Sequence, residues 1–266
     1  MHHPLVTIVT INLNNAAELE QTLKSVLAQD YDHLELIVVD GASTDGSVDV
    51  IRKYQPHIAR FVSEPDRGIY DAMAKGVGLA SGEYVCFVNS GDQLAHKSAV
   101  SDTFAAVSGA RADLIYGGHE TRYERGFSRI SWPDEPKQLW KRMICSHQAL
   151  FTRRSLLQDM PFDQRFKLNA DYAFIYRAYR GGATLQRVNV IVASVSAGGS
   201  SDVDRRTSIV SRWQIVRGNP YTFRADVYYA WLLLDFKLRA FAKRFLSKNL
   251  VLKIAASKKS RQLPAA

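Results

Sequence analysis

The stretch Leu5-Val-Thr-Ile-Val-Thr-Ile11 is a run of apolar and β-branched residues near the start of the chain. A run without polar alternation is typical of a strand buried on both faces of a parallel sheet. Asn14 and Asn15 interrupt it, and Asn15 suits the N-cap of a following helix. The apolar residues beyond them recur at helical spacing, namely Leu19, Leu23, Val26 and Leu27.

The same alternation of strands and helices continues to about residue 90. Further strands are predicted at residues 34–39, 61–62 and 84–88, and helices at residues 48–54 and 70–79. This order predicts an α/β fold, a doubly wound and mostly parallel sheet. Such sheets bind ligands at the carboxyl ends of their strands, so polar residues there are candidate site residues.

The second half of the domain is predicted in less detail. Residues 120–136 are polar and contain Trp and Pro, which indicates an excursion loop or a hairpin. Other elements expected here are strands at residues 113–117, 149–151 and 188–195 and a helix at residues 171–180. We expect one domain over residues 1–200, followed by an extension over residues 201–266.

Composition narrows the class of protein. Of the 266 residues, 46% are hydrophobic and 23% charged, which is ordinary for a soluble globular protein and excludes extensive disorder. Cys86 and Cys145 are too few for a disulfide framework and are expected as reduced core residues, although His147 near Cys145 leaves a cysteine nucleophile open. We expect no signal peptide, because residues 5–11 are too short and lack a basic flank.

The basic charge is concentrated in the extension. Residues from Ser201 onward carry 14 Lys and Arg against 4 Asp and Glu, whereas the first 200 residues carry 21 against 22. A basic segment on a near-neutral body indicates a polyanionic partner.

Residues 221–253 are predicted to be helical. Apolar residues form a stripe, namely Trp231, Leu234, Leu238, Phe241 and Phe245, with cations around it. No apolar run approaches the roughly 20 residues that a membrane span needs. Two interpretations stay open: a helix lying in the interface of an anionic membrane, or a stripe packed on the body with solvated cations. A nucleic-acid partner is not expected, because the cations lack spaced aromatic residues.

Several motifs together carry a family resemblance over roughly residues 5–200. The chain resembles the family 2 glycosyltransferases, and most of all the bacterial transferases that assemble exopolysaccharide, of the colanic-acid and O-antigen kind. The motifs are Thr7-Ile-Val-Thr-Ile-Asn-Leu-Asn14, Leu36-Ile-Val-Val-Asp-Gly-Ala-Ser-Thr-Asp-Gly46, Glu64-Pro-Asp-Arg-Gly-Ile-Tyr-Asp-Ala-Met73, Gly82-Glu-Tyr84, Asn89-Ser-Gly-Asp92, His147-Gln148 and Asn169-Ala-Asp-Tyr172.

The resemblance implies a GT-A fold, a nucleotide-diphosphate sugar donor, Mg²⁺ or Mn²⁺, and inversion at the anomeric carbon. It also implies a saccharide acceptor, which we expect to be lipid-linked. The enzyme would then work in the cytoplasm, peripherally on the inner face of the cell membrane.

Asp92 is the expected metal ligand, because it follows the fourth strand where the family carries its aspartate-rich metal motif. Asn89 and Gly91 occupy the other motif positions, so a single carboxylate remains. Mg²⁺ and Mn²⁺ prefer carboxylate and phosphate oxygens, so the donor diphosphate would supply much of the coordination. Asp92 could instead cap the following helix.

The nucleotide is expected near the end of the second strand. There the resemblance assigns Asp40 to a base N–H, with Thr10 bordering the pocket. Arg67 would approach the diphosphate or the nucleotide, and Asp66 would orient it or touch the base. Asp40 could instead be a turn residue, and the charges at residues 66 and 67 could be plain surface charges.

Asp171 is the expected general base, since Asn169-Ala-Asp-Tyr172 matches the family's acidic catalytic motif. A carboxylate suits removal of a sugar hydroxyl proton. His147 and Gln148 match a further family position and are expected on the acceptor or diphosphate side. Asp171 could instead cap its helix, and His147 could be a core histidine.

Two other functions stay open. A sugar nucleotidyltransferase would need a cationic glycine-rich loop after the first strand, where the chain reads Asn12-Leu-Asn-Asn-Ala16. A non-catalytic scaffold of a polysaccharide assembly complex would fit the reduced metal motif. The lack of a P-loop or a Gly-x-Gly-x-x-Gly motif removes the usual support for an ATPase or a dinucleotide oxidoreductase.

Overall fold

A computed structural model of the chain describes residues 3–107, 112–123, 126–198, 204–217 and 223–245. The chain divides into two compact units, Met1–Val203 and Asp204–Ala266.

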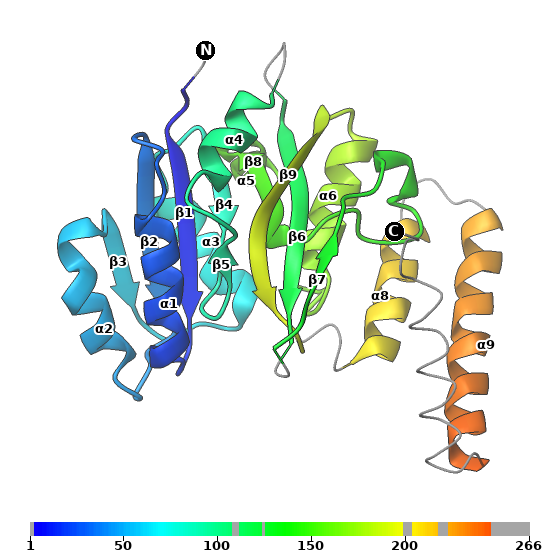
Figure 1. Cartoon of the computed structure of the whole chain (residues 1–266). Helices are drawn as coiled ribbons and strands as arrows, with labels where there is room; N and C mark the ends of the chain where they lie inside the picture. The colour runs from blue at the N-terminus through cyan, green and yellow to red at the C-terminus, as the bar shows by residue number, and fades with distance from the viewer. Residues whose placement is uncertain (1–2, 108–111, 124–125, 199–203, 218–222, 246–266) are drawn as a thin grey trace. The chain divides into compact units, whose positions relative to one another are not determined.

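The first unit is built on one nine-stranded sheet (Figure 1). Its strands lie in the order β3-β2-β1-β4-β8-β6-β9-β5, and β7 pairs with β6 outside this path. Their bounds are β1 (Val6–Asn12), β2 (Leu34–Asp40), β3 (Arg60–Ser63), β4 (Tyr84–Phe87), β5 (Gln93–Leu94), β6 (Leu114–Arg122), β7 (Ser128–Ser131), β8 (Leu150–Arg153) and β9 (Leu185–Ser196).

The first four strands are parallel, as their sequence predicted: β1 pairs with both β2 and β4, and β2 pairs with β3. Beyond β4 the sheet is mixed, because β8 runs antiparallel to both β4 and β6, while β9 runs parallel to β6. Residues 120–136, expected as a loop or hairpin, contain the end of β6 and the whole of β7, which pair as an antiparallel hairpin.

Helices cover both faces of the sheet. Figure 1 shows α1 (Ala16–Leu27) and α2 (Ser47–Tyr54) on one face and α3 (Ile69–Leu79) on the other. Phe162 contacts Tyr70 of α3 and Phe174 of α6, which joins these helices on their face of the sheet. The described residues of this unit also form α4 (Ala99–Ala105), α5 (Arg154–Asp159), α6 (Ala170–Arg180) and the short 3-10 turns Gln55–His57, Pro136–Gln138 and His147–Ala149.

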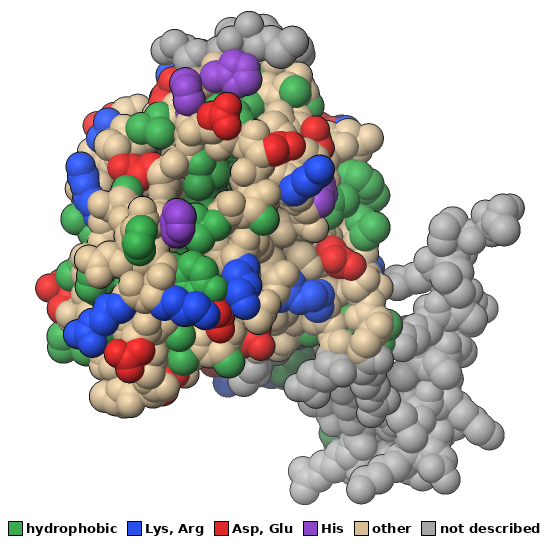
Figure 2. Space-filling model, turned by 60° about the vertical axis from the view of Figure 1, so that its left-hand side comes forward, with side chains coloured by type: hydrophobic (Ala, Val, Ile, Leu, Met, Phe, Trp, Pro, Cys, Tyr) green, Lys and Arg blue, Asp and Glu red, His purple; other side chains and the backbone are tan. Residues whose placement is uncertain are grey.

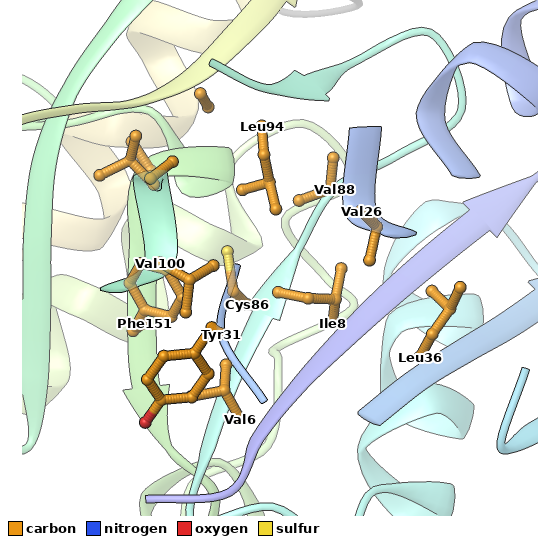
Figure 3. Packing of buried hydrophobic residues seen from close by; sticks show 14 of the residues in the cluster. Val6, Ile8, Val26, Tyr31, Leu36, Cys86, Val88, Leu94, Val100 and Phe151 are labelled. Atoms are coloured by element: carbon orange, nitrogen blue, oxygen red, sulfur yellow. The ribbon is translucent and has the colours of Figure 1, made fainter. Parts of the chain in front are cut away.

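The apolar runs of the strands form the core. Val6 and Ile8 of β1 are fully buried and pack with Val26 of α1, and the cluster continues through Cys86 to Phe151 of β8 (Figure 3). Burial of this kind contributes roughly 25 cal/mol for each Å² of apolar surface removed from water. The buried core therefore fixes the positions of the strand ends, where the polar motifs lie.

Charged side chains of both signs lie on the surface of the molecule. On the face that Figure 2 shows, Lys and Arg side chains gather along the lower part, with Asp and Glu side chains among them.

The second unit contains α8 (Arg205–Arg217) and α9 (Phe223–Phe245). They are joined by the stacked rings of Trp213 and Tyr229 and by Asp226, which accepts a hydrogen bond from Trp213 Nε1 and pairs with Arg217. Helix α9 lies inside the predicted helix 221–253, and Lys248 and Lys253 lie outside the described residues. Over the part of the chain that is described, no helix combines the length and the apolar character that crossing a membrane requires.

Candidate active site

A cleft of about 1220 Å³ opens in the first unit beside the loop that follows β4. Its walls come from the start of α1, from β6, from residues 143–148 and from the start of α6. Four of the expected site residues line this cleft, namely Asp92, His147, Gln148 and Asp171. Thr10, Asp40, Asp66 and Arg67 are not among its lining residues.

Asp171 lies in the first turn of α6 and points its carboxylate into the cleft, with 20% of the side chain exposed. Its Oδ1 accepts hydrogen bonds from the Tyr70 hydroxyl at 2.9 Å and from the Tyr172 N–H at 2.8 Å. Its Oδ2 lies 3.4 Å from His147 Nδ1. Burial alone would raise the pKa of Asp171, but His147, the Tyr172 N–H and Tyr70 together lower it below the ordinary value. The group is therefore an ionised carboxylate at neutral pH.

His147 links Asp171 to the loop after β4. Its Nε2 lies 3.1 Å from Asn89 Nδ2. The Asn89 amide can donate to this nitrogen, while the other ring nitrogen, Nδ1, faces Asp171. Burial and the charge of Asp171 raise the pKa of Tyr70. The Tyr70 hydroxyl therefore keeps its proton and donates it in the hydrogen bond to Asp171.

Asp92 is buried in the cleft wall, with only 9% exposed. Its Oδ2 accepts a hydrogen bond from Gln148 Nε2 at 2.6 Å, and its Oδ1 accepts one from the Ser196 N–H at 3.0 Å. His119, which also lines the cleft, has its pKa lowered by burial, an effect that the charge of Asp92 opposes. Adjacent residues, His147 and Gln148, thus hold the two carboxylates of the cleft.

The donor set at Asp92 fits a divalent cation only in part. Each Asp92 oxygen accepts one of these hydrogen bonds and has a second lone pair. Among the described residues, however, no group of three His, Cys, Asp or Glu side chains could hold a metal ion. A cation such as Mg²⁺ is commonly held by one or two carboxylates together with substrate phosphates, and Asp92 suits that shared arrangement.

Asp40 belongs to a separate network at the ends of the first three strands. Asn12, Asp40 and Ser63 are direct cross-strand partners. Asp40 is fully buried and accepts four hydrogen bonds, from Asn12 Nδ2, the Ser43 N–H and the hydroxyls of Ser43 and Ser63. Burial alone would raise the pKa of Asp40, but these bonds lower it. A carboxylate has about four acceptor sites, so a base N–H could bind only after a serine hydroxyl rotates away.

The other expected nucleotide contacts lie around this network. The Asp66 carboxylate accepts a hydrogen bond from the Gly68 N–H at 2.8 Å and lies against Gly41, where an added Cβ would be 2.7 Å from its Oδ2. The Arg67 side chain is 79% exposed and pairs with Asp71. Thr10 Oγ1 is buried and has no hydrogen-bond partner among the described residues, so a ligand or a water molecule could satisfy it.

Cys145 lines the cleft, but burial raises the pKa of its thiol and the charge of Asp171 raises it further. A thiol held neutral is a poor nucleophile, so the structure disfavours the cysteine alternative.

Most of the cleft-lining residues, among them Tyr70, Arg122 and Trp132, were not expected site residues. Tyr70 sits inside the quoted motif Glu64–Met73, so that motif already contained the signal for it. Arg122 and Trp132 lie at the end of β6 and just after β7. They carried no signal, because residues 120–136 were not resolved into strands from the sequence.

Comparisons with known proteins agree with this architecture. The family model for Glycosyl transferase family 2 matches residues 7–180. The chain is 34% identical over 207 residues to a PGL/p-HBAD biosynthesis glycosyltransferase of Mycobacterium bovis, covering 73% of this chain and 77% of that protein.

Two solved structures share the fold. The mannosyltransferase PcManGT of Pyrobaculum calidifontis, in complex with GDP-Man and Mn²⁺, has a TM-score of 0.66 at 18% identity, over 99% of this chain and 82% of that one. Residues 1–349 of S. aureus TarS in complex with UDP have a TM-score of 0.61 at 19% identity, over 79% and 69%. The fold is thus that of GT-A glycosyltransferases, and the chain belongs to glycosyl transferase family 2.

Proposed function

We propose that this glycosyltransferase moves a sugar, with inversion, from a nucleotide-diphosphate donor to a hydroxyl of a saccharide acceptor in the synthesis of a cell-surface polysaccharide. The observation that carries the proposal is the Asp171 carboxylate, which is ionised, partly exposed in the cleft and fixed from three directions. It has the charge and the access that a general base needs.

In the proposed reaction, the acceptor hydroxyl attacks the anomeric carbon as its proton passes to Asp171. The new C–O bond forms on the face opposite the bond to the departing nucleotide diphosphate, which inverts the configuration. Tyr70 and His147 keep the carboxylate aimed at the acceptor by donating to its two oxygens. A fixed carboxylate loses little free energy to reorientation when the reaction occurs.

The donor is proposed to lie between the two carboxylates of the cleft and the Asp40 network. Asp40, Thr10 and Asp66 would hold the nucleoside, with Arg67 close to it or to the diphosphate. Asp92 would hold Mg²⁺ or Mn²⁺ jointly with the diphosphate, and the cation would neutralise charge on the departing group. Support for metal use comes from the fold relative that contains Mn²⁺.

The acceptor is proposed to be lipid-linked, with the protein peripheral on the cytoplasmic face of the cell membrane. Six large apolar side chains of α9 are exposed at intervals of three or four residues, namely Phe223, Val227, Trp231, Leu234, Leu238 and Phe241. An apolar stripe on a basic helix suits the interface of an anionic bilayer. A membrane-bound enzyme would meet a lipid-linked saccharide at that interface.

A nucleotide screen followed by a turnover assay tests the function. Thermal shift against UDP, GDP and the other nucleoside diphosphates, with Mg²⁺ or Mn²⁺, is expected to identify one base that stabilises the protein. Hydrolysis of the matching nucleotide sugars, with and without Mn²⁺, is then expected to show slow release of the diphosphate. A protein that binds none of these nucleotides and hydrolyses none of the donors would be the scaffold instead.

A further inference from the structure

Arg122, the last residue of β6, lies beside the loop that follows β4. Its guanidinium donates to the Gly91 carbonyl at 2.6 Å, to the Ser194 carbonyl at 2.7 Å and to Ser196 Oγ at 3.1 Å. These contacts join the β4 loop to the end of β9 and fix the side chain in the cleft wall. Arg122 therefore occupies a set position next to Asp92, whose Oδ1 is held by the Ser196 N–H.

Within the described part of the chain, the Arg122 guanidinium forms no ion pair with a carboxylate. Its three acceptors are uncharged oxygens, and within the described ranges no Asp or Glu lies at ion-pair distance from the guanidinium. The pKa of Glu120 is lowered mainly by hydrogen bonds from Ser128 and Ser194. The positive charge of Arg122 lowers it further. The three bonds use three of the five guanidinium N–H groups.

The fixed positive charge of Arg122 at this place attracts an anionic ligand. Asn89 and Gly91 carry no charge, so Asp92 is the single carboxylate in the stretch Asn89-Ser-Gly-Asp92. An anionic group beside the Gly91 carbonyl would meet the guanidinium, and opposite charges attract strongly in a partly buried site. Arginine binds phosphate oxygens with charge-assisted and often bidentate hydrogen bonds.

We infer that Arg122 binds the diphosphate of the nucleotide donor and gives the cleft a positive charge that does not depend on a metal ion. The inference rests on the proposed function, because it takes a nucleotide diphosphate as the ligand. Arg122 then supplies part of the neutralisation that the reduced motif Asn89-Ser-Gly-Asp92 cannot obtain from carboxylate-bound metal. Selectivity for a diphosphate over a monophosphate should therefore survive in EDTA.

Calorimetric titration of the full chain with UDP, UMP, GDP and GMP in EDTA tests this. The wild-type protein is expected to bind the diphosphate of its preferred base more tightly than the monophosphate. Hydrogen bonds to charged groups imply a loss of about 10- to 100-fold in diphosphate affinity for Arg122→Gln. The monophosphate affinity of Arg122→Gln should stay nearly unchanged. Arg122→Lys keeps the positive charge but loses the bidentate guanidinium, so its diphosphate affinity should lie between those of the wild type and Arg122→Gln.

Arg129→Gln is the matched control, because Arg129 lies on β7 of the same hairpin, is exposed and is not among the cleft-lining residues. Unchanged monophosphate affinity and melting temperature would show that each variant keeps its fold. If Arg122→Gln retains the diphosphate preference, or if the wild-type preference appears only with Mn²⁺, the inference is wrong. If the wild-type protein binds neither kind of nucleotide even after Mn²⁺ is added, the proposed function itself fails.

Discussion

His147 Nδ1 lies 3.4 Å from Asp171 Oδ2, while the next side chain, Gln148, donates to Asp92 across 2.6 Å. One short 3-10 turn, His147–Ala149, thus sets the positions of both carboxylates in the cleft. The two acids are far apart in sequence, but they share this support, so a change at either contact should be measurable at the site.

Replacing Asp171 with Asn should abolish transfer while leaving donor binding intact. An amide keeps the size of the side chain but cannot accept the acceptor proton, and general-base catalysis typically contributes about 100- to 10,000-fold. Turnover and nucleotide affinity measured on the same preparation check this. Asp49→Asn, at a side chain that is 80% exposed, is the control and should retain full turnover. Unchanged turnover in Asp171→Asn would remove this residue from the mechanism.

His147→Ala should shift the acid limb of the pH–rate profile to higher pH. The base must be ionised to act, so activity falls as pH drops through its pKa. Burial raises the pKa of Asp171, and His147 is the first of the groups that lower it again. Without His147 the pKa of Asp171 rises, and activity is lost at a higher pH than in the wild type.

Tyr70→Phe provides a comparison for this shift. Tyr70 lowers the pKa of Asp171 less than His147 does, so its loss should move the acid limb in the same direction but by less. Profiles of kcat/KM for the three proteins check the order. Superimposable acid limbs would show that the acid limb does not report Asp171.

The first half of the fold was predictable because its signals are local. Leu5–Ile11 and residues 34–39 are continuous apolar runs, and burial on both faces of a parallel strand needs no more information than that. Polar residues after these runs then fell at one edge of the sheet, and Asn12 and Asp40 are indeed cross-strand partners.

The second half depends on pairing between distant segments, which one sequence does not reveal. Strand β5 has two residues and exists because it pairs with β9, about 100 residues away. Helices α4, α5 and α8 were not predicted, and the first two are only seven and six residues long.

The site shows the same division. Motifs identified Asp92, His147, Gln148 and Asp171, and the structure places these four in one cleft. The pairing of His147 with Asn89 and the position of Arg122 depend on how the β4 loop, β6 and β9 meet, so spacing along the chain did not indicate them.

Asp40→Asn should lower both stability and nucleotide affinity. The new amide group would place a donor against the donors that now bind Asp40, leaving buried polar atoms unpaired. Each such atom costs about 1–3 kcal/mol. Urea unfolding and nucleotide titration measure the two effects. Asp32→Asn, at an exposed side chain, should change neither. Wild-type stability in Asp40→Asn would contradict the importance of this network.

Serine substitutions at Trp231, Leu234 and Leu238 should release the protein from anionic vesicles. All three side chains are more than half exposed and lie on one stripe of α9. Burial of a large apolar side chain contributes roughly 1.5–3 kcal/mol, so losing three should weaken partitioning at least about tenfold. Sedimentation with phosphatidylserine-containing vesicles checks this. Equal binding by the triple variant would show that the stripe does not contact the bilayer.

Gly76→Ala and Gly78→Ala should change stability in opposite directions, although both glycines lie in α3. A Cβ at residue 76 would be 2.3 Å from Val9 Cγ1, so the helix could no longer lie against β1 without displacement. Overpacking of this kind costs about 1–3 kcal/mol. At residue 78 a Cβ meets nothing within 4 Å, and alanine is favoured over glycine in a helix by roughly 1 kcal/mol. Urea unfolding of the two variants tests the contrast. Equal effects would show that helix propensity alone, and not the contact with Val9, governs this helix.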